Sequence, residues 1–424
     1  MVVVYTCDEL TPDLCELEKE QGLVEVNGIN VTYFKYFQAV HDNNNPNDDA
    51  QQRRQKFPIV AIHGGPSFTH NYMLPLKQQA CLGRTIIFYD QAGCGKSLPP
   101  GTDGTVKFNV SDFPWLLDPL YYSTVELPAL IRHLGLRDFH IVANSWGTML
   151  SQLYALEAAK EDETRKHLVS MVLSGPLSDS VSYIEAQWSQ TDGSLGSLPP
   201  FIQKRIHSLE ENKDYDSEEY QTLDSILTGF FTLRTQPSPD CWIDSENQQN
   251  AEIYTAMQGP SEFTMQGVLG NFNVTGRLKE IEVPVLLSHG KYDTMRPSIV
   301  ETMRKTLPNA ETLFLEKSGH ASMIDEPGKM NDGIANFFDR VETANKIKKK
   351  KKSLFFFGRT TTWSRSTSFL EQQRANPSQV MMESSVHVST MILSALMALM
   401  VGYVMGHYRA NHHKRRSYYT AIYD

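Results

Sequence analysis

The chain has 424 residues, which is enough for one large domain with a deep core and additional segments. Of these residues 40% are hydrophobic and 10% are aromatic, a composition that excludes wholesale disorder. The net charge of −9 is uneven, because residues 346–424 hold 13 Lys and Arg against 3 Asp and Glu, or +10, which leaves −19 on the preceding residues. An acidic body argues against nucleic acid as a partner, since such binding depends on neutralising phosphates.

The first residues, 1–22, are expected to form an N-terminal extension, without the basic region and long apolar core of a signal peptide. Asn30, Asn109 and Asn273 each begin an N-x-[ST] sequon, a pattern that often arises by chance, so we expect them to be unmodified unless the domain is lumenal. The cysteines are odd in number and form no CxxC pair, which favours reduced thiols over a zinc site or a dense disulfide framework. They are Cys7, Cys15, Cys81, Cys94 and Cys241.

The following segments alternate between strand and helix. Residues 23–38 alternate apolar and polar around Asn27-Gly28, which predicts a β-hairpin, and a polar loop follows at 41–56. Short apolar and β-branched runs predict strands at 59–62, 85–89, 140–143, 169–173, 283–288 and 312–315, and amphipathic stretches predict helices at 125–133, 148–159 and 299–305. Strands alternating with helices indicate an α/β fold with a mostly parallel sheet that helices cover on both faces.

Residues 178–276 interrupt this rhythm. The strand pattern disappears there and helical, acidic stretches replace it. We expect a helical cap inserted after the sixth strand, between a first core part at 23–177 and a second core part at 277–345 that ends in a helix from about 328 to 344.

The composition changes again after residue 345. Residues 346–387 are basic and aperiodic, which predicts a disordered linker, and a basic tail follows at 407–424. Between them, residues 388–406 contain no charge and would span about 28 Å as a helix, so we expect a single transmembrane helix. A span this near the C-terminus favours a tail anchor with a cytosolic body, although the positive charges beyond it, such as Arg409 and Lys414, favour the opposite orientation.

The segment Ala143-Asn144-Ser145-Trp146-Gly147 follows a predicted strand and begins a predicted helix. A serine on such a tight turn, with small residues two positions before and after it, is typical of a nucleophile elbow. An ordinary strand-to-helix turn is the alternative. Asp293 and His320 favour the first interpretation, because each follows a late predicted strand and the order Ser, Asp, His is that of α/β hydrolases.

In this interpretation His320 is the general base for Ser145 and Asp293 orients the imidazole, with Asp325 and Glu316 as alternative acids. The turn His63-Gly64-Gly65-Pro66 follows the strand at 59–62, so the backbone N–H groups of Gly65 and Trp146 are predicted to form the oxyanion hole. His63 and the remaining histidines are taken as structural or solvated. No metal and no cofactor is predicted. The run Gly93-Cys94-Gly95-Lys96-Ser97 is not a P-loop, because Asp90 stands where that motif requires Gly.

The residues from about 23 to 344 resemble the proline iminopeptidase family of serine aminopeptidases. The likeness rests on 63–66, 90–97, 144–147 and the cap block Tyr254-Thr255-Ala256-Met257-Gln258-Gly259-Pro260-Ser261-Glu262-Phe263. The resemblance implies an enzyme that releases an N-terminal residue, often proline, from peptides with a free N-terminus. It also implies that Glu262 binds the α-amine of the substrate. The chain departs from the family at Ala143, Ser67 and Ala92, where Gly, Gly and Arg are usual.

The sequence therefore predicts a serine aminopeptidase attached to a membrane. The alternatives are a membrane-anchored esterase or amidase with the same triad, or a catalytically silent hydrolase-fold scaffold. Oligomeric state and residue preference are left open.

Overall fold

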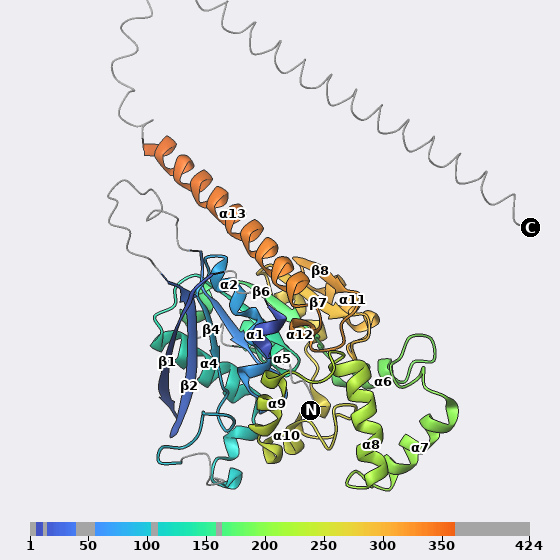
Figure 1. Ribbon diagram of the computed structural model, residues 1–424. Coiled ribbons are helices and arrows are strands. Elements are labelled where there is room, and N and C mark those ends of the chain that lie inside the picture. Colours follow the sequence, from blue (N-terminus) through green and yellow to red (C-terminus); the bar gives the residue numbers. More distant parts are fainter. Residues whose placement is uncertain (1–5, 12–14, 40–55, 103–108, 158–162, 361–424) are drawn as a thin grey trace, which may run out of the picture. The chain divides into compact units, whose positions relative to one another are not determined.

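A computed structural model describes residues 6–11, 15–39, 56–102, 109–157 and 163–360, with side chains as far as residue 347. The chain divides into two units, Met1–Asn345 and Lys346–Asp424. The first unit is an α/β domain (Figure 1). Residues 41–55 of the expected polar loop, the remainder of the expected linker and the segment 388–406 lie outside the described residues.

The first unit is built on an eight-stranded sheet with the order β1-β2-β4-β3-β5-β6-β7-β8. The hairpin β1–β2 is antiparallel, β2 also pairs antiparallel with β4, and all the other pairs are parallel. All six predicted runs are strands, and each lies where the sequence predicted it to within a few residues. The strands are β1 (Leu17–Val26), β2 (Ile29–Gln38), β3 (Ile59–Ile62), β4 (Ile86–Tyr89), β5 (Phe139–Asn144), β6 (Leu168–Ser174), β7 (Val285–Gly290) and β8 (Ala310–Leu315).

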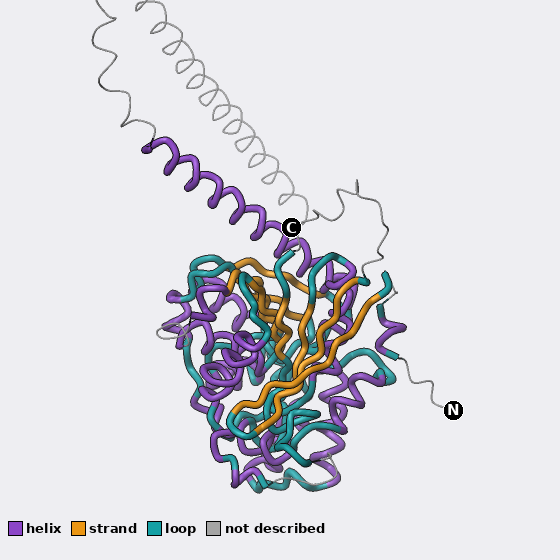
Figure 2. Tube along the Cα trace, turned by 90° about the vertical axis from the view of Figure 1, so that its left-hand side faces the viewer, coloured by secondary structure: helices purple, strands orange, loops and turns teal. Residues whose placement is uncertain are grey.

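Helices cover both faces of this sheet, as Figure 2 shows from the side. Alternate residues of the central strands enter two different cores: Ala143 and Leu173 pack toward the core that includes α5, whereas Val142 and Val172 pack toward the core that includes α13. This period of two, with every residue of β3, β4 and β5 buried, is what a strand covered on both faces requires. The helices of these layers are α2 (Gln78–Cys81), α3 (Pro119–Tyr121), α4 (Leu127–His133), α5 (Trp146–Glu157), α11 (Pro297–Thr306), α12 (Ser322–Asp325) and α13 (Pro327–Thr360).

The stretch between β6 and β7 contains helices and irregular segments. Its outer part has a small core of its own, formed by Leu195, Ile206, Leu227 and Phe263. The helices are α6 (Ser180–Gln187), α7 (Pro200–Glu211), α8 (Glu218–Leu227), α9 (Asp240–Asn247) and α10 (Ala251–Met257), with the π-helix η8 (Thr228–Thr232) and the 3₁₀ helices η9 (Val268–Asn271) and η10 (Thr275–Glu280). The remaining short helices are α1 (Cys7–Leu10), η2 (His70–Lys77), η3 (Val110–Asp112), η4 (Pro114–Leu117), the π-helix η5 (Tyr122–Glu126) and η7 (Glu163–His167).

The cysteines correct the expectation of reduced thiols. Cys7 and Cys241 form a disulfide with Cα atoms 5.8 Å apart, and so do Cys15 and Cys81 with Cα atoms 5.5 Å apart. Only Cys94 is free, and it is buried. The partners lie 234 and 66 residues apart in the chain, so spacing along the sequence carries no signal of either pair.

Two boundaries also differ from the expectation. β1 begins at Leu17, inside the expected extension, because it is an edge strand whose first residues are exposed and therefore lack an apolar pattern. α13 continues to Thr360, inside the expected disordered linker, because Lys, Leu and Phe sustain a helix and no proline interrupts them. None of the helices that the structure describes has the length and apolar character needed to cross a bilayer.

Candidate active site

Ser145 lies at the turn between β5 and α5. Its φ of 56° is in the left-handed region, which non-glycine residues rarely adopt, and its N–H donates to the Ser174 carbonyl at 3.0 Å. A Cβ atom at Gly147 would lie 2.4 Å from the Ile62 carbonyl oxygen, so this position requires glycine. Ala143 is different, because its methyl group is accommodated in the core beneath the turn. The turn therefore keeps the elbow geometry despite the alanine.

His320 and Asp293 lie together on the loops that follow the carboxyl ends of β8 and β7. Nδ1 of His320 lies 2.8 Å from Oδ1 of Asp293, and both side chains are buried. Oδ1 of Asp293 also accepts the Met295 N–H at 2.9 Å, which fixes the carboxylate. Nε2 of His320 has no hydrogen-bond partner among the described residues. Nδ1 of the imidazole is thus fixed by Asp293, whereas Nε2 remains available to another group.

The alternative acids have other positions. The Asp325 carboxylate accepts the N–H groups of Gly319, Arg234 and Thr235, and it thereby supports the loop before His320 without contacting the imidazole. Glu316 is exposed. Asp293 is therefore the carboxylate that the structure brings to His320.

The loop that carries His320 is anchored on the segment between β6 and β7. The N–H of His320 donates to the Phe231 carbonyl at 2.9 Å, and the N–H of Ala321 donates to the Thr232 carbonyl at 2.8 Å. On its other side, a Cβ atom at Gly175 would lie 2.5 Å from the His320 ring. Gly175 also has φ of 56°, so this glycine, which sequence reasoning missed, is needed for the approach of the imidazole.

Burial alone would lower the pKa of His320, because it disfavours the imidazolium. The Asp293 carboxylate outweighs burial through its charge and hydrogen bond, Glu262 adds to it, and the pKa is raised to about 8. His63 behaves in the opposite way: burial lowers its pKa to about 4, and its ring accepts the Gln91 N–H. His63 is thus a neutral structural histidine, as predicted.

Gly65 and Trp146 carry the backbone N–H groups that were predicted to form the oxyanion hole. Gly65 has φ of 108° and lines the same cavity as Ser145. Trp146 is the first residue of α5, and its indole is fixed by a bond of 2.8 Å to Gln91. Within the described part of the chain, neither backbone N–H donates to another group. Both are thus available as donors, which an oxyanion hole requires.

A cavity of about 250 Å³ contains both Ser145 and His320. Its walls include the aromatic side chains of Phe68, Tyr72 and Trp242. No Lys or Arg is among the described residues that line it, whereas three carboxylates are: Glu262, Glu246 and Asp224.

The sequence pointed to Glu262 alone among these acids. Oε2 of Glu262 accepts the Tyr254 hydroxyl at 3.2 Å, and Oε1 of Glu246 accepts the Trp242 indole N–H at 2.7 Å. Burial raises the pKa of all three carboxyl groups, that of Asp224 to about 6. Oδ1 of Asp224 has no hydrogen-bond partner in the described residues. The cavity is therefore suited to a cationic group.

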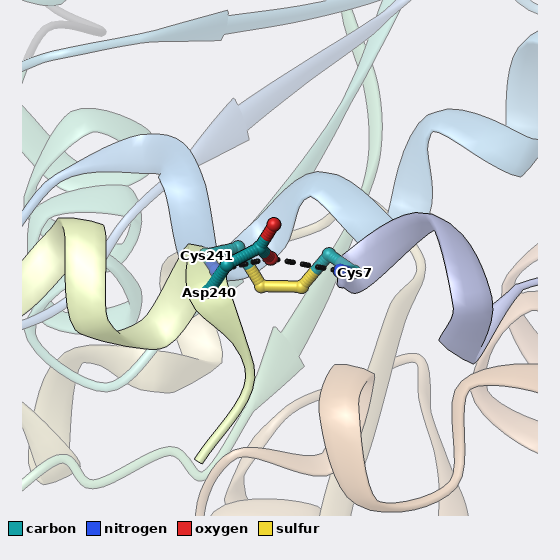
Figure 3. Close-up of side chains that lie close together, drawn as sticks. All are labelled: Cys7, Asp240 and Cys241. Atoms are coloured by element: carbon teal, nitrogen blue, oxygen red, sulfur yellow. Dashed lines mark hydrogen bonds between the residues drawn. A yellow bond between two sulfur atoms is a disulfide. The ribbon is translucent and has the colours of Figure 1, made fainter. Parts of the chain in front are cut away.

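The candidate metal ligands offer no site. In the described residues, the cluster of possible ligands is Cys7, Asp240 and Cys241, and both of its sulfur atoms are engaged in one disulfide (Figure 3).

The elbow turn, the His–Asp pair and the parallel sheet together define an α/β hydrolase, and a model of the alpha/beta hydrolase fold matches residues 58–327. The chain is 34% identical over 288 residues to the proline iminopeptidase of Heyndrickxia coagulans, which covers 67% of the chain and 91% of that relative. It is 25% identical over 323 residues to the proline iminopeptidase of Thermoplasma volcanium, covering 76% and 97%. The crystal structure of proline iminopeptidase from Mycobacterium smegmatis shares the fold with a TM-score of 0.63 at 24% identity, covering 77% of the chain and 100% of that structure.

The chain thus belongs to the proline iminopeptidase family, and at the level of the family it is a serine hydrolase with aminopeptidase activity.

Proposed function

We propose that the chain releases an N-terminal residue, with preference for proline, from peptides by way of an acyl-enzyme on Ser145. The observation that carries the proposal is the shared cavity. Ser145 and the unpartnered Nε2 of His320 line it together, while Nδ1 of the same ring is bonded to buried Asp293. This is the arrangement that a serine nucleophile, its general base and an orienting acid require.

In the proposed reaction, His320 takes the hydroxyl proton of Ser145 as the oxygen attacks the carbonyl carbon of the first residue. The negative charge on the carbonyl oxygen is stabilised by the N–H groups of Gly65 and Trp146. His320 then gives its proton to the leaving amine, which departs as the shortened peptide and leaves an ester on Ser145. A water molecule, deprotonated by His320, cleaves that ester and releases the free amino acid.

We propose that Glu262 binds the ammonium of the substrate together with Glu246 or Asp224. The ammonium of an N-terminal proline has two N–H donors, so it needs two acceptors when it leaves water. Glu262 supplies one carboxylate and the two further acids of the cavity supply the second. The aromatic walls are suited to the pyrrolidine ring. A site that pairs the free amine next to Ser145 explains why such an enzyme would remove one residue at a time.

A substrate panel on purified protein tests this proposal. We expect prolyl-naphthylamide to be hydrolysed faster than the alanyl and leucyl analogues, and N-acetylprolyl-naphthylamide not to be hydrolysed. Ser145→Ala is the control and should lose activity by about 10⁴-fold or more. Hydrolysis of plain esters without any aminoacyl cleavage would instead support the esterase alternative. A failure of Ser145 to react with a fluorophosphonate would support the silent scaffold.

Glu262→Gln tests the amine site separately. Loss of one charge opposite a desolvated ammonium costs about 3–5 kcal/mol, so we expect kcat/KM for prolyl-naphthylamide to fall by about 10²–10⁴-fold. At about pH 9 and above, where His320 is neutral with or without the Glu262 charge, hydrolysis of p-nitrophenyl acetate, which has no amine, should stay within about twofold of the wild-type rate. An equal loss on both substrates would show that Glu262 supports the triad and does not bind the amine.

We also propose that residues 388–406 attach the protein to a membrane, on the evidence of their length and lack of charge. The full chain should then float with liposomes after alkaline extraction, and a chain ending at residue 387 should not.

A further inference from the structure

We infer that the catalytic body folds in an oxidising compartment and carries N-linked glycans on Asn109 and Asn273. The inference does not depend on the proposed enzymatic activity, and only its argument from charge rests on the proposed membrane segment. It starts from the two disulfides, because structural disulfides persist in secreted and lumenal proteins and are rare where glutathione keeps thiols reduced.

The first disulfide joins the N-terminal helix α1 to the helix α9. The Cys7 N–H also donates to Oδ1 of Asp240 at 2.8 Å, so a second contact brings the same two helices together (Figure 3). The disulfide is buried, with Cys7 5% and Cys241 3% exposed. α9 supplies Trp242 and Glu246 to the cavity, so the bond tethers one wall of the active site. These contacts give the disulfide a structural role.

The second disulfide joins Cys15, directly before β1, to Cys81 at the end of α2. Together the two bonds hold both ends of the N-terminal segment against the domain. All five cysteines are described, and the unpaired one, Cys94, is 1% exposed. Once the chain is folded, burial of its one free thiol protects both disulfides from exchange with it. Each bond forms when two thiols lose two protons and two electrons to the disulfide of a thiol oxidoreductase, which becomes a dithiol.

In such a compartment the three N-x-[ST] sequons become candidate sites of N-linked glycosylation. Asn109 and Asn273 are exposed, whereas Asn30 is half-buried in β2, where it pairs with Glu25 of β1 and its N–H donates to the Leu98 carbonyl. In glycosylation, the amide nitrogen of Asn forms a bond to C1 of a lipid-linked oligosaccharide, loses one proton, and lipid diphosphate leaves. The nitrogen keeps its second hydrogen, so Nδ2 of Asn273 can still donate to Asp179, a bond of 2.7 Å in the structure. We therefore expect two glycans.

The positive charges after residues 388–406 also favour a body on the oxidising side of the membrane. If residues 388–406 cross the membrane and the body lies on the oxidising side, the residues after the span lie on the cytosolic side. These include Arg409, Lys414, Arg415 and Arg416. This is the orientation that the positive-inside rule favours, and it is opposite to the tail anchor expected from the position of the span.

Counting thiols in the full chain, isolated from the cells that produce it, tests the compartment. After denaturation without reductant, a maleimide of high mass should modify one cysteine, and after reduction it should modify five. Five modified cysteines before reduction would overturn the inference, whatever the enzymatic activity of the sample.

Digestion with an endoglycosidase tests the glycans. We expect a loss of mass equal to two glycans, reduced to one by Ser111→Ala or by Thr275→Val and unchanged by the matched replacements Ser111→Thr and Thr275→Ser, which keep the sequons. Asn30→Gln should not alter the mass shift. The absence of any shift in the native protein would refute the modification of Asn109 and Asn273.

Discussion

Replacing Asp293 by Asn removes the charge that raises the pKa of His320 and changes little else in shape. The pKa of His320 is raised from 6.5 to about 8 although burial opposes the charged form, so the net stabilisation of the imidazolium is about 2 kcal/mol. With an amide in place of the carboxylate, burial dominates and the pKa of His320 should fall below 6.5. The amide can also bind the wrong tautomer of the ring, and we expect kcat/KM to fall by about 10³–10⁴-fold.

The pH dependence of kcat/KM measures this change, because it reports the groups that titrate in the free enzyme. In the proposed mechanism His320 must be neutral to act as the base, so the ascending limb of the wild-type profile should lie near pH 8 and that of Asp293→Asn should move to lower pH. Glu316→Gln is the control on an exposed acid and should leave both rate and profile unchanged. An ascending limb that stays near pH 8 in Asp293→Asn would show that another carboxylate holds the imidazole.

Three further predictions follow from the same geometry. Gly175→Ala should lower kcat by about 10²-fold or more, because the added methyl group would meet the His320 ring. The control is Gly135→Ala: Gly135 has a similar φ of 59° and open space around it, so this variant should have the same backbone strain and keep its activity. The pH profile of kcat/KM for a prolyl amide should be bell-shaped, since activity rises as His320 loses its proton and falls as the substrate amine loses its own proton at a pKa of about 8. The pH profile for a neutral ester should show only the ascending limb. Arg84→Met should lower the free energy of unfolding, measured by chemical denaturation, by about 3–5 kcal/mol, because it leaves the buried Glu342 carboxylate without its guanidinium partner. A loss below about 1 kcal/mol would contradict this account.

The order of elements and the position of Ser145 on a tight turn after β5 could be predicted from the sequence. Strands covered on both faces have continuous apolar runs, and the tight turn around Ser145 requires small neighbours, so both leave a local signal. Asp293 and His320 could be predicted because the fold brings the ends of neighbouring parallel strands to one edge of the sheet. These inferences need only local backbone preferences and the chain order.

Other features depend on contacts between distant segments, for which the sequence has no local signal. Glu246 and Asp224 are ordinary acidic residues of helices until tertiary packing brings α9 and α8 to the cavity of Ser145. Gly175 is one glycine after a strand until the His320 ring is placed against it. Cys7 and Cys241 are 234 residues apart, and only the folded chain brings their Cα atoms within 5.8 Å. Local backbone preferences and the chain order thus predicted the scaffold and the candidate residues Ser145, Asp293 and His320, whereas tertiary packing decided the charge of the cavity and the pairing of the cysteines.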